Sequence, residues 1–277
     1  MVSTADVHNF VSAWKQLTPA DSTCVALEPY WSSATPGLES YARKFDVTHP
    51  DLCAAIRQRS ERYAALESES TALDSAAVAI RAVYARLAAI HPLSNEPSVY
   101  FVVGDGISAG STTLGKHPII LVGTEMVKSI HSLDWIVAHE LVHTQQDYPW
   151  LGSMNGGPEF LRGSLLRHSI TEGSADFIAS LVTGRPDSNV WAEEREAELW
   201  EQFRHDADSH VYSQWLYNGW NRKALGERPP ELGYWMGYRI TQSYYHNAPD
   251  KTKAIADILS IRDFTAFLAA SKYNGGS

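Results

Sequence analysis

Several features that would point to particular classes of protein are scarce or missing in this sequence of 277 residues. No apolar run is long enough to cross a bilayer, so we expect no membrane-spanning segment. The chain has no Lys/Arg-rich run, and its formal net charge is -9. Nucleic acids and anionic membranes attract basic patches, so neither is expected as the main partner. The N-terminal stretch MVSTADVHNFVSAWKQL lacks the pattern of a secretory signal peptide.

Cysteine is also scarce, because only Cys24 and Cys53 are present. They are not expected to bind a metal, since the sequence has no C-x-x-C pair and no Cys/His cluster. They form either one disulfide in an oxidising compartment or two buried thiols in the cytoplasm, and the sequence leaves both possibilities open.

The residues that are present predict a mainly helical α+β protein. In residues 1–92 apolar side chains recur at three- and four-residue spacing, which indicates helices. PSVYFVVG and PIILVGTEM are rich in β-branched and aromatic residues and predict two buried strands. Between them lies a Gly/Ser/Thr-rich loop with a weak strand, and helical patterns return after the second strand. We therefore predict an N-terminal helical region over 1–92 and a core over 93–277.

One motif in the core has the spacing of a metal site. In IVAHELVHTQQD, residues 136–147, His139 and His143 are four residues apart. On a helix they lie on one face, where two imidazoles can bind one tetrahedral ion. Glu140 is rotated from His139 by about 100° and is a candidate general base for a metal-activated water. The alternative is a partly buried helix that carries two histidines by chance.

A third ligand is suggested by the next helical segment, which contains ITEGSAD. Glu172 and Asp176 are again four residues apart, with small residues between them that allow close helix packing. Two carboxylates in an otherwise apolar helix are costly to bury unless they are paired or bind a cation. The alternative is a helix N-terminus with Glu172 near the dipole and Asp176 at the surface.

With both motifs in place, the sequence resembles the gluzincin metallopeptidases. The resemblance implies that His139, His143 and Glu172 bind Zn²⁺ and that Glu140 is the general base. It also implies that Asp176 orients a ligand histidine through a hydrogen bond. Glu172 follows the motif at a longer distance than in thermolysin-like members, and the Gly-rich segment Leu151–Pro158 accounts for the extra length.

The order of several segments between residues 93 and 245 is similar to that of the bacterial zinc-dependent proteases of the DUF2268 type. These segments are VYFVVG, IILVGTEM, AHELVHTQQ, TEGSADFIASLVTG and ELGYWMGYRI. Those proteases have some similarity to the gliding-motility GldB lipoproteins. The resemblance implies a zincin-like core, with a small mixed or antiparallel sheet packed on the helix of the HExxH motif. Because many such proteins are exported or lipid-anchored, it favours an extracytoplasmic location over a cytoplasmic one.

The reaction would need a further donor for the developing oxyanion and a place for the substrate backbone. We favour Tyr238 as the donor, because the Gly-Tyr-Arg segment belongs to the resemblance. Tyr234, His168 and Tyr148 are the other candidates. A buried aromatic residue with a satisfied hydroxyl is the alternative for Tyr238. The segment that begins with Gly110, Ser111 and Thr112 is small and polar enough to be an open strand edge for a peptide, or else a plain surface loop.

The predicted function is zinc-dependent hydrolysis of a peptide or protein substrate. A di-iron site would need a second E-x-x-H motif, and only the one from Glu140 to His143 is present. The remaining alternative is a non-enzymatic, metal-stabilised scaffold or binding protein of the cell envelope. Structural zinc sites usually have four protein ligands, whereas this site offers three, which is the catalytic arrangement.

Overall fold

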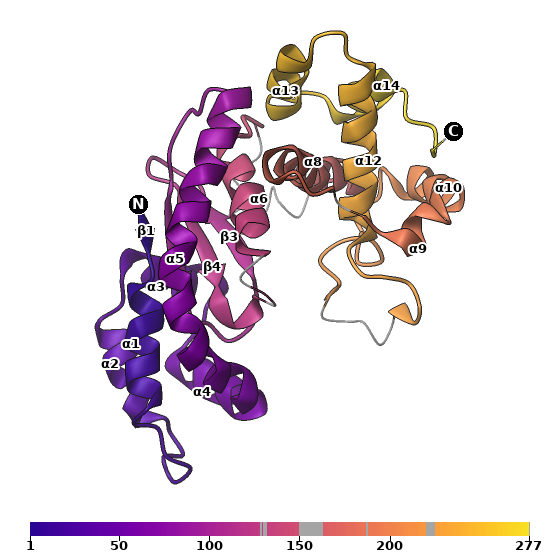
Figure 1. Ribbon diagram of the computed structural model, residues 1–277. Coiled ribbons are helices and arrows are strands. Elements are labelled where there is room, and N and C mark those ends of the chain that lie inside the picture. The colour runs from indigo at the N-terminus through magenta and orange to yellow at the C-terminus, as the bar shows by residue number, and fades with distance from the viewer. Residues whose placement is uncertain (128, 130–131, 150–162, 187, 220–224, 277) are drawn as a thin grey trace. The chain divides into compact units, whose positions relative to one another are not determined.

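The chain forms two compact units in the computed structural model, which describes residues 1–127, 129, 132–149, 163–186, 188–219 and 225–276. Unit 1 comprises Met1–Arg86 and Leu93–Thr144, and unit 2 comprises Leu87–Pro92 and Gln145–Ser277. The fold is α+β and mainly helical with one small mixed sheet (Figure 1). The predicted fold class is therefore confirmed.

The sheet belongs to unit 1 and has four strands in the order β1-β2-β4-β3. The strands are β1 (Val2–Ser3), β2 (Ser98–Val102), β3 (Gly110–Thr113) and β4 (Ile119–Gly123). β2 pairs in parallel with both β1 and β4, whereas β3 runs antiparallel to β4. β2 and β4 are buried along almost their whole length, which explains why each reads as an unbroken apolar run. β3 lies at an edge of the sheet.

Six α-helices and two short 3-10 helices carry the rest of the described secondary structure up to residue 145. They are α1 (Ala5–Trp14), η1 (Val25–Leu27), α2 (Glu28–Ser32), α3 (Pro36–Phe45), α4 (His49–Gln58), α5 (Ser60–Ile90), η2 (Thr124–Met126) and α6 (Leu133–Gln145). Thr48 and Asp51 form a capping box that begins α4. α1 and α3 contact β2. The helical prediction for residues 1–92 is confirmed apart from β1, whose Val2 pairs with Val99 far along the chain.

Cys24 and Cys53 form a disulfide, with their Cα atoms 5.8 Å apart. Cys24 directly precedes η1 and Cys53 lies in α4. The bond closes a loop between residues 29 positions apart in sequence, which restricts the unfolded chain. The structure thus adopts the disulfide alternative that the sequence left open.

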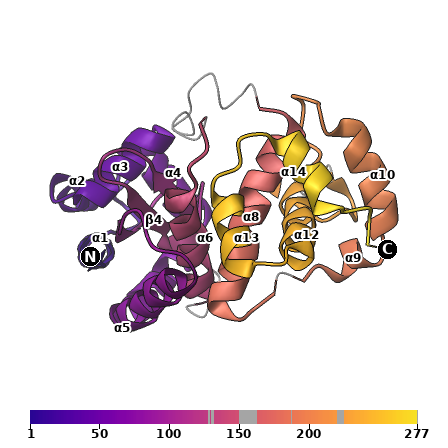
Figure 2. The same ribbon diagram turned by 90° about the horizontal axis from the view of Figure 1, so that it is seen from above.

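Unit 2 is built around α8 (Leu165–Thr183), which is buried along nearly all of its length. Its other described helices are α9 (Val190–Glu193), α10 (Glu196–Asp206), α12 (Leu232–Asn247), α13 (Lys251–Leu259) and α14 (Phe264–Ser271). α12, α13 and α14 all contact α8 (Figure 2). Ser164 caps the start of α8 by accepting a hydrogen bond from the Arg167 N–H, and Gly184 ends the helix in the left-handed conformation.

The division into units differs from the boundary near residue 93 that the sequence predicts. The strands of the sheet pack with the N-terminal helices, so residues 93–144 fold with residues 1–86. A change in local sequence pattern marks where strands begin, and it does not show which helices cover them. The Gly-rich segment 151–158 lies outside the described residues. Among the residues described, no helix has the length and apolar character needed to cross a membrane.

Candidate metal centre

In unit 1 the motif helix α6 presents its two histidines side by side. The Nε2 atoms of His139 and His143 are 2.9 Å apart, and their rings meet nearly edge to face. His143 is 4% exposed and His139 is half-buried. Four-residue spacing on a helix produces this convergence without help from the rest of the fold.

The spacing of the two nitrogens fits a shared zinc ion. Two Zn–N bonds of about 2.0–2.1 Å at a tetrahedral angle place the nitrogens roughly 3.3 Å apart. The observed Nε2–Nε2 distance of 2.9 Å is within a few tenths of an ångström of that separation. Both nitrogens are also of the ligand type that zinc prefers.

Glu140 lies beside this pair and is held by the edge strand β3. Its side chain is 7% exposed, and the Thr112 hydroxyl donates to its Oε2 at 2.7 Å. Gly110 passes so close that a Cβ atom there would lie 2.9 Å from Glu140 Oε1 and 2.7 Å from a methyl carbon of Ile136. Glycine at 110 thus allows strand and helix to approach closely. Glu140 is therefore buried with one oxygen oriented by a neutral donor.

The three residues predicted at the substrate edge do lie on β3. Gly110, Ser111 and Thr112 are consecutive in this strand, and Ser111 and Thr112 are each 8% exposed. The Thr112 carbonyl accepts a hydrogen bond from Lys44 Nζ at 2.6 Å. The segment is therefore a strand at the edge of the sheet and not a surface loop. One of its carbonyl groups, that of Thr112, already accepts a hydrogen bond.

In unit 2, Glu172 and Asp176 lie one turn apart on α8 and are 4% and 8% exposed. Both carboxylates are thus buried, which contradicts the alternative that Asp176 lies at the surface. The hydroxyl of Tyr217 donates to Glu172 Oε1 at 3.0 Å. Burial raises the pKa of Tyr217, and the Glu172 carboxylate raises it further, so the hydroxyl keeps its proton and acts as a donor.

The predicted aromatic residues fall in different surroundings within unit 2. Tyr234, on α12, lies near Glu172. Its pKa is raised mainly by burial, and the negative charge of Glu172 is the next largest cause. His168 is fully buried, with Nδ1 3.4 Å from the Tyr217 hydroxyl. Tyr238 is one turn further along α12, and its hydroxyl lies 3.4 Å from Ser180 Oγ. The catalytic role of Tyr238 stays a prediction, whereas Tyr217, which was not among the predicted residues, donates a hydrogen bond to Glu172.

Sequence reasoning missed Tyr217 and the role of the Thr112 side chain. Tyr217 lies in an irregular segment that no motif or periodicity singles out, 45 positions away from Glu172. The sequence suggests Thr112 only for its backbone, whereas its hydroxyl contacts Glu140 28 positions away. Neither contact leaves a local signal, because each joins segments that only the fold brings together.

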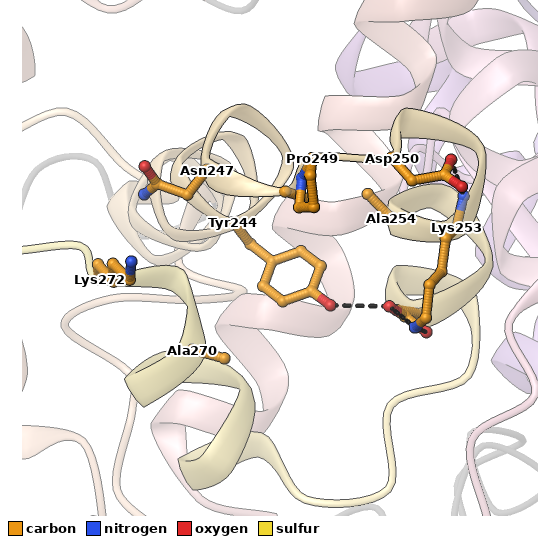
Figure 3. A pocket seen from close by; sticks show the side chains of 10 residues that line it. Tyr244, Asn247, Pro249, Asp250, Lys253, Ala254, Ala270 and Lys272 are labelled. Carbon is orange, nitrogen blue, oxygen red and sulfur yellow. Dashed lines mark hydrogen bonds and ion pairs between the residues drawn. The ribbon is translucent and has the colours of Figure 1, made fainter.

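A separate cavity of about 330 Å³ lies near the C-terminal end of unit 2 (Figure 3). It opens between α12, α13 and α14, and Tyr244, Lys253 and Asp257 are among its lining residues. The Tyr244 hydroxyl donates to Asp257 Oδ2 at 2.9 Å, and Lys253 also pairs with Asp257. None of the residues that line this cavity belongs to the predicted site.

Comparison with known proteins finds similarity over part of the chain. The family model of the gliding motility protein GldB matches residues 181–275, roughly a third of the chain. The matched stretch includes Tyr217, Tyr234 and Tyr238, and it begins after His143 and Glu172. It agrees with the distant similarity to GldB noted from the sequence. No curated protein and no solved structure matches the chain.

Proposed function

We propose that the protein is a zinc-dependent peptidase with a zincin-like core, in which His139, His143 and Glu172 bind Zn²⁺. The observation that carries this proposal is the pair of converging Nε2 atoms on α6 beside the buried Glu140. Glu172, the third ligand in this proposal, is a buried carboxylate of unit 2. Two imidazoles and one carboxylate form a ligand set typical of catalytic zinc.

The chain's own residues supply the acid–base chemistry. When bound, zinc would polarise a substrate carbonyl and lower the pKa of a water molecule. Glu140 would be the general base, because its carboxylate can accept a proton from a water molecule and pass it to the leaving amine. Thr112 donates to Oε2, so the other oxygen, Oε1, is the proposed proton acceptor. Asp176 is proposed to orient a ligand histidine.

The proposed substrate is a peptide in extended conformation. β3 is an edge strand that passes directly over Glu140, and an edge strand can bind a peptide through main-chain hydrogen bonds. Because Gly110 has no side chain, the backbone of β3 can lie close to the general base. Lys44 occupies the Thr112 carbonyl, so the peptide would pair with other backbone groups of β3.

The compartment we propose is extracytoplasmic. Disulfides persist in secreted and periplasmic proteins and are rare in the reducing cytosol, and Cys24 and Cys53 are joined by one. The match to a gliding motility protein over residues 181–275 is compatible with a cell-envelope setting.

Glu140→Gln separates metal binding from hydrolysis, because glutamine preserves the shape of the side chain and cannot accept the proton as a base. We expect unchanged zinc content by elemental mass spectrometry and a loss of hydrolysis of a peptide library of about 10²–10⁴-fold. Glu172→Gln should lose zinc as well as activity. Glu193→Gln, the same change at an exposed position of α9, should match the wild type in both assays. A wild type without zinc, or full turnover by Glu140→Gln, would refute the peptidase proposal.

A second candidate function is favoured by the match to a gliding motility protein. In this case the metal would stabilise a scaffold or binding protein that does not hydrolyse peptides. The same experiment separates the two candidates. A wild type that binds zinc through His139, His143 and Glu172 but cleaves no peptide in the library supports the scaffold.

A further inference from the structure

The segment that carries Tyr217 has an unusual backbone conformation. Tyr217 has φ 54° and Glu231, at the start of α12, has φ 62°. Both are left-handed values that glycine adopts readily and other residues adopt at a cost. Non-glycine residues persist in this conformation when surrounding interactions hold them there, and such residues are concentrated at functional sites.

The Glu231 carboxylate supplies those interactions. Its Oε2 accepts a hydrogen bond from the Tyr217 N–H at 2.7 Å. Its Oε1 accepts from the N–H groups of Asn218 and Gly219 at 2.8 and 2.7 Å. Asn218 Oδ1 in turn accepts from the Glu231 N–H at 2.9 Å, so the two segments hold each other reciprocally. We call Glu231 and the backbone of residues 217–219 the Glu231 clamp.

The clamp presents the Tyr217 side chain to α8. The hydroxyl donates to Glu172 Oε1 at 3.0 Å and lies 3.4 Å from His168 Nδ1. The rings of Tyr234 and Tyr212 lie edge-on to the Tyr217 ring, at centroid distances of 6.1 and 6.0 Å. Buried among these rings, the hydroxyl has a restricted direction, and that direction is toward one oxygen of Glu172.

A neutral donor suits a carboxylate that must also bind a cation. A lysine or arginine at this position would neutralise the negative charge that attracts the metal. A phenol orients the carboxylate, occupies one lone pair of Oε1 and leaves the charge in place. From this geometry we propose that Tyr217, held by the Glu231 clamp, is a positioning residue that orients Glu172 for metal binding. This inference rests on the proposed role of Glu172 as a zinc ligand.

Zinc affinity tests the inference without reference to activity. We expect Tyr217→Phe, which removes only the hydroxyl, to weaken zinc binding by about 10–100-fold in competition with a chelator. Its Co²⁺ complex should show a visible absorption spectrum different from that of the wild type, because the carboxylate is no longer held in one orientation. Tyr212→Phe is the matched control, since Tyr212 contacts the same ring cluster through the Tyr217 and His168 rings. It should bind zinc as the wild type does.

Glu231→Gln provides an independent arm should Tyr217→Phe fail to fold. Glutamine keeps one acceptor oxygen, so the clamp loosens and zinc affinity should fall by about tenfold or more. Wild-type zinc affinity in both Tyr217→Phe and Glu231→Gln, or an equal loss in Tyr212→Phe, would overturn the positioning role. Wild-type zinc affinity in Glu172→Gln would instead overturn the ligand assignment, so the two failures are distinguishable.

Discussion

Several buried carboxylates in this protein are held by donors from distant parts of the sequence. Thr112 donates to Glu140, and Tyr217 donates to Glu172. A third carboxylate, that of Glu125 in η2, accepts hydrogen bonds from the backbone N–H groups of residues 104 and 106, each at 3.0 Å. Removing a carboxylate from water is unfavourable unless such donors replace its hydration. Each arrangement therefore offsets part of the cost of burial and also sets the direction of the carboxylate.

The Glu125 carboxyl should make the stability of unit 1 dependent on pH. Burial raises its pKa from 4.5 to about 7, although hydrogen bonds from Gly104 and Gly106 oppose the increase. Between these values the folded protein holds a proton that the unfolded chain releases. This proton stabilises the folded state fully below the pKa of the unfolded chain, and the stabilisation is lost as the pH rises through the pKa of the folded protein. Relative to Glu125→Gln, the free energy of unfolding of the wild type should fall by up to about 1.4 kcal/mol per pH unit in this window.

Urea unfolding of both proteins at several pH values measures this difference. Glutamine cannot replace both acceptor oxygens, so the variant is expected to be less stable at low pH. The test is how the difference in the free energy of unfolding between the wild type and Glu125→Gln changes with pH. Parallel pH profiles for the wild type and Glu125→Gln would show that this carboxyl does not titrate as described.

Among the helices, the crossing of α8 and α12 depends on glycine. A Cβ atom at Gly237 would lie 1.7 Å from the Ser169 carbonyl oxygen, and one at Gly173 would lie 2.1 Å from the Tyr238 nitrogen. The atoms in the way belong to the backbone, which cannot move aside as a flexible side chain can. This close approach packs α12, which carries Tyr234, against α8, which carries the candidate ligand Glu172.

Gly237→Ala should therefore separate the two helices or distort one of them. We expect a loss of ~3 kcal/mol or more in the free energy of unfolding, at the upper end of the cost of overpacking a core. Urea unfolding followed by tryptophan fluorescence measures it. His246→Ala, at an exposed position of the same helix, should change stability by no more than about 0.5 kcal/mol. A Gly237→Ala protein as stable as this control would contradict the close packing.

For the molecule as a whole, the proposed ligands are divided between the two compact units. His139 and His143 belong to unit 1, whereas Glu172 belongs to unit 2. A ligand that binds only the folded state stabilises every part of the protein that has to be folded for binding. Zinc bound as proposed would therefore stabilise both units, and a metal held by the histidines alone would stabilise unit 1.

Hydrogen exchange with and without zinc measures this effect in each unit. At a zinc concentration of about 100 times the dissociation constant, we expect added protection of up to about 2.7 kcal/mol at amides of both α6 and α8. In Glu172→Gln the added protection of α8 should disappear. Protection confined to α6 in the wild type would contradict the assignment of Glu172 as a ligand.

The sequence by itself determined the features that have short-range causes. His139 and His143, like Glu172 and Asp176, are four residues apart, and helical geometry alone places each pair on one face. Capping residues and the stop at Gly184 are equally local. The apolar strands, and with them the mainly helical α+β class, follow from composition over short windows.

Only the tertiary structure decided the features that join distant segments. The disulfide, the parallel pairing of β1 with β2, the Thr112–Glu140 contact and the Glu231 clamp each connect residues more than ten positions apart. The sequence has no period or spacing for such contacts, because they depend on how whole elements pack. A helix brings its own side chains together, whereas the donors that orient Glu140 and Glu172 come from other segments. The fold alone brings those segments into contact.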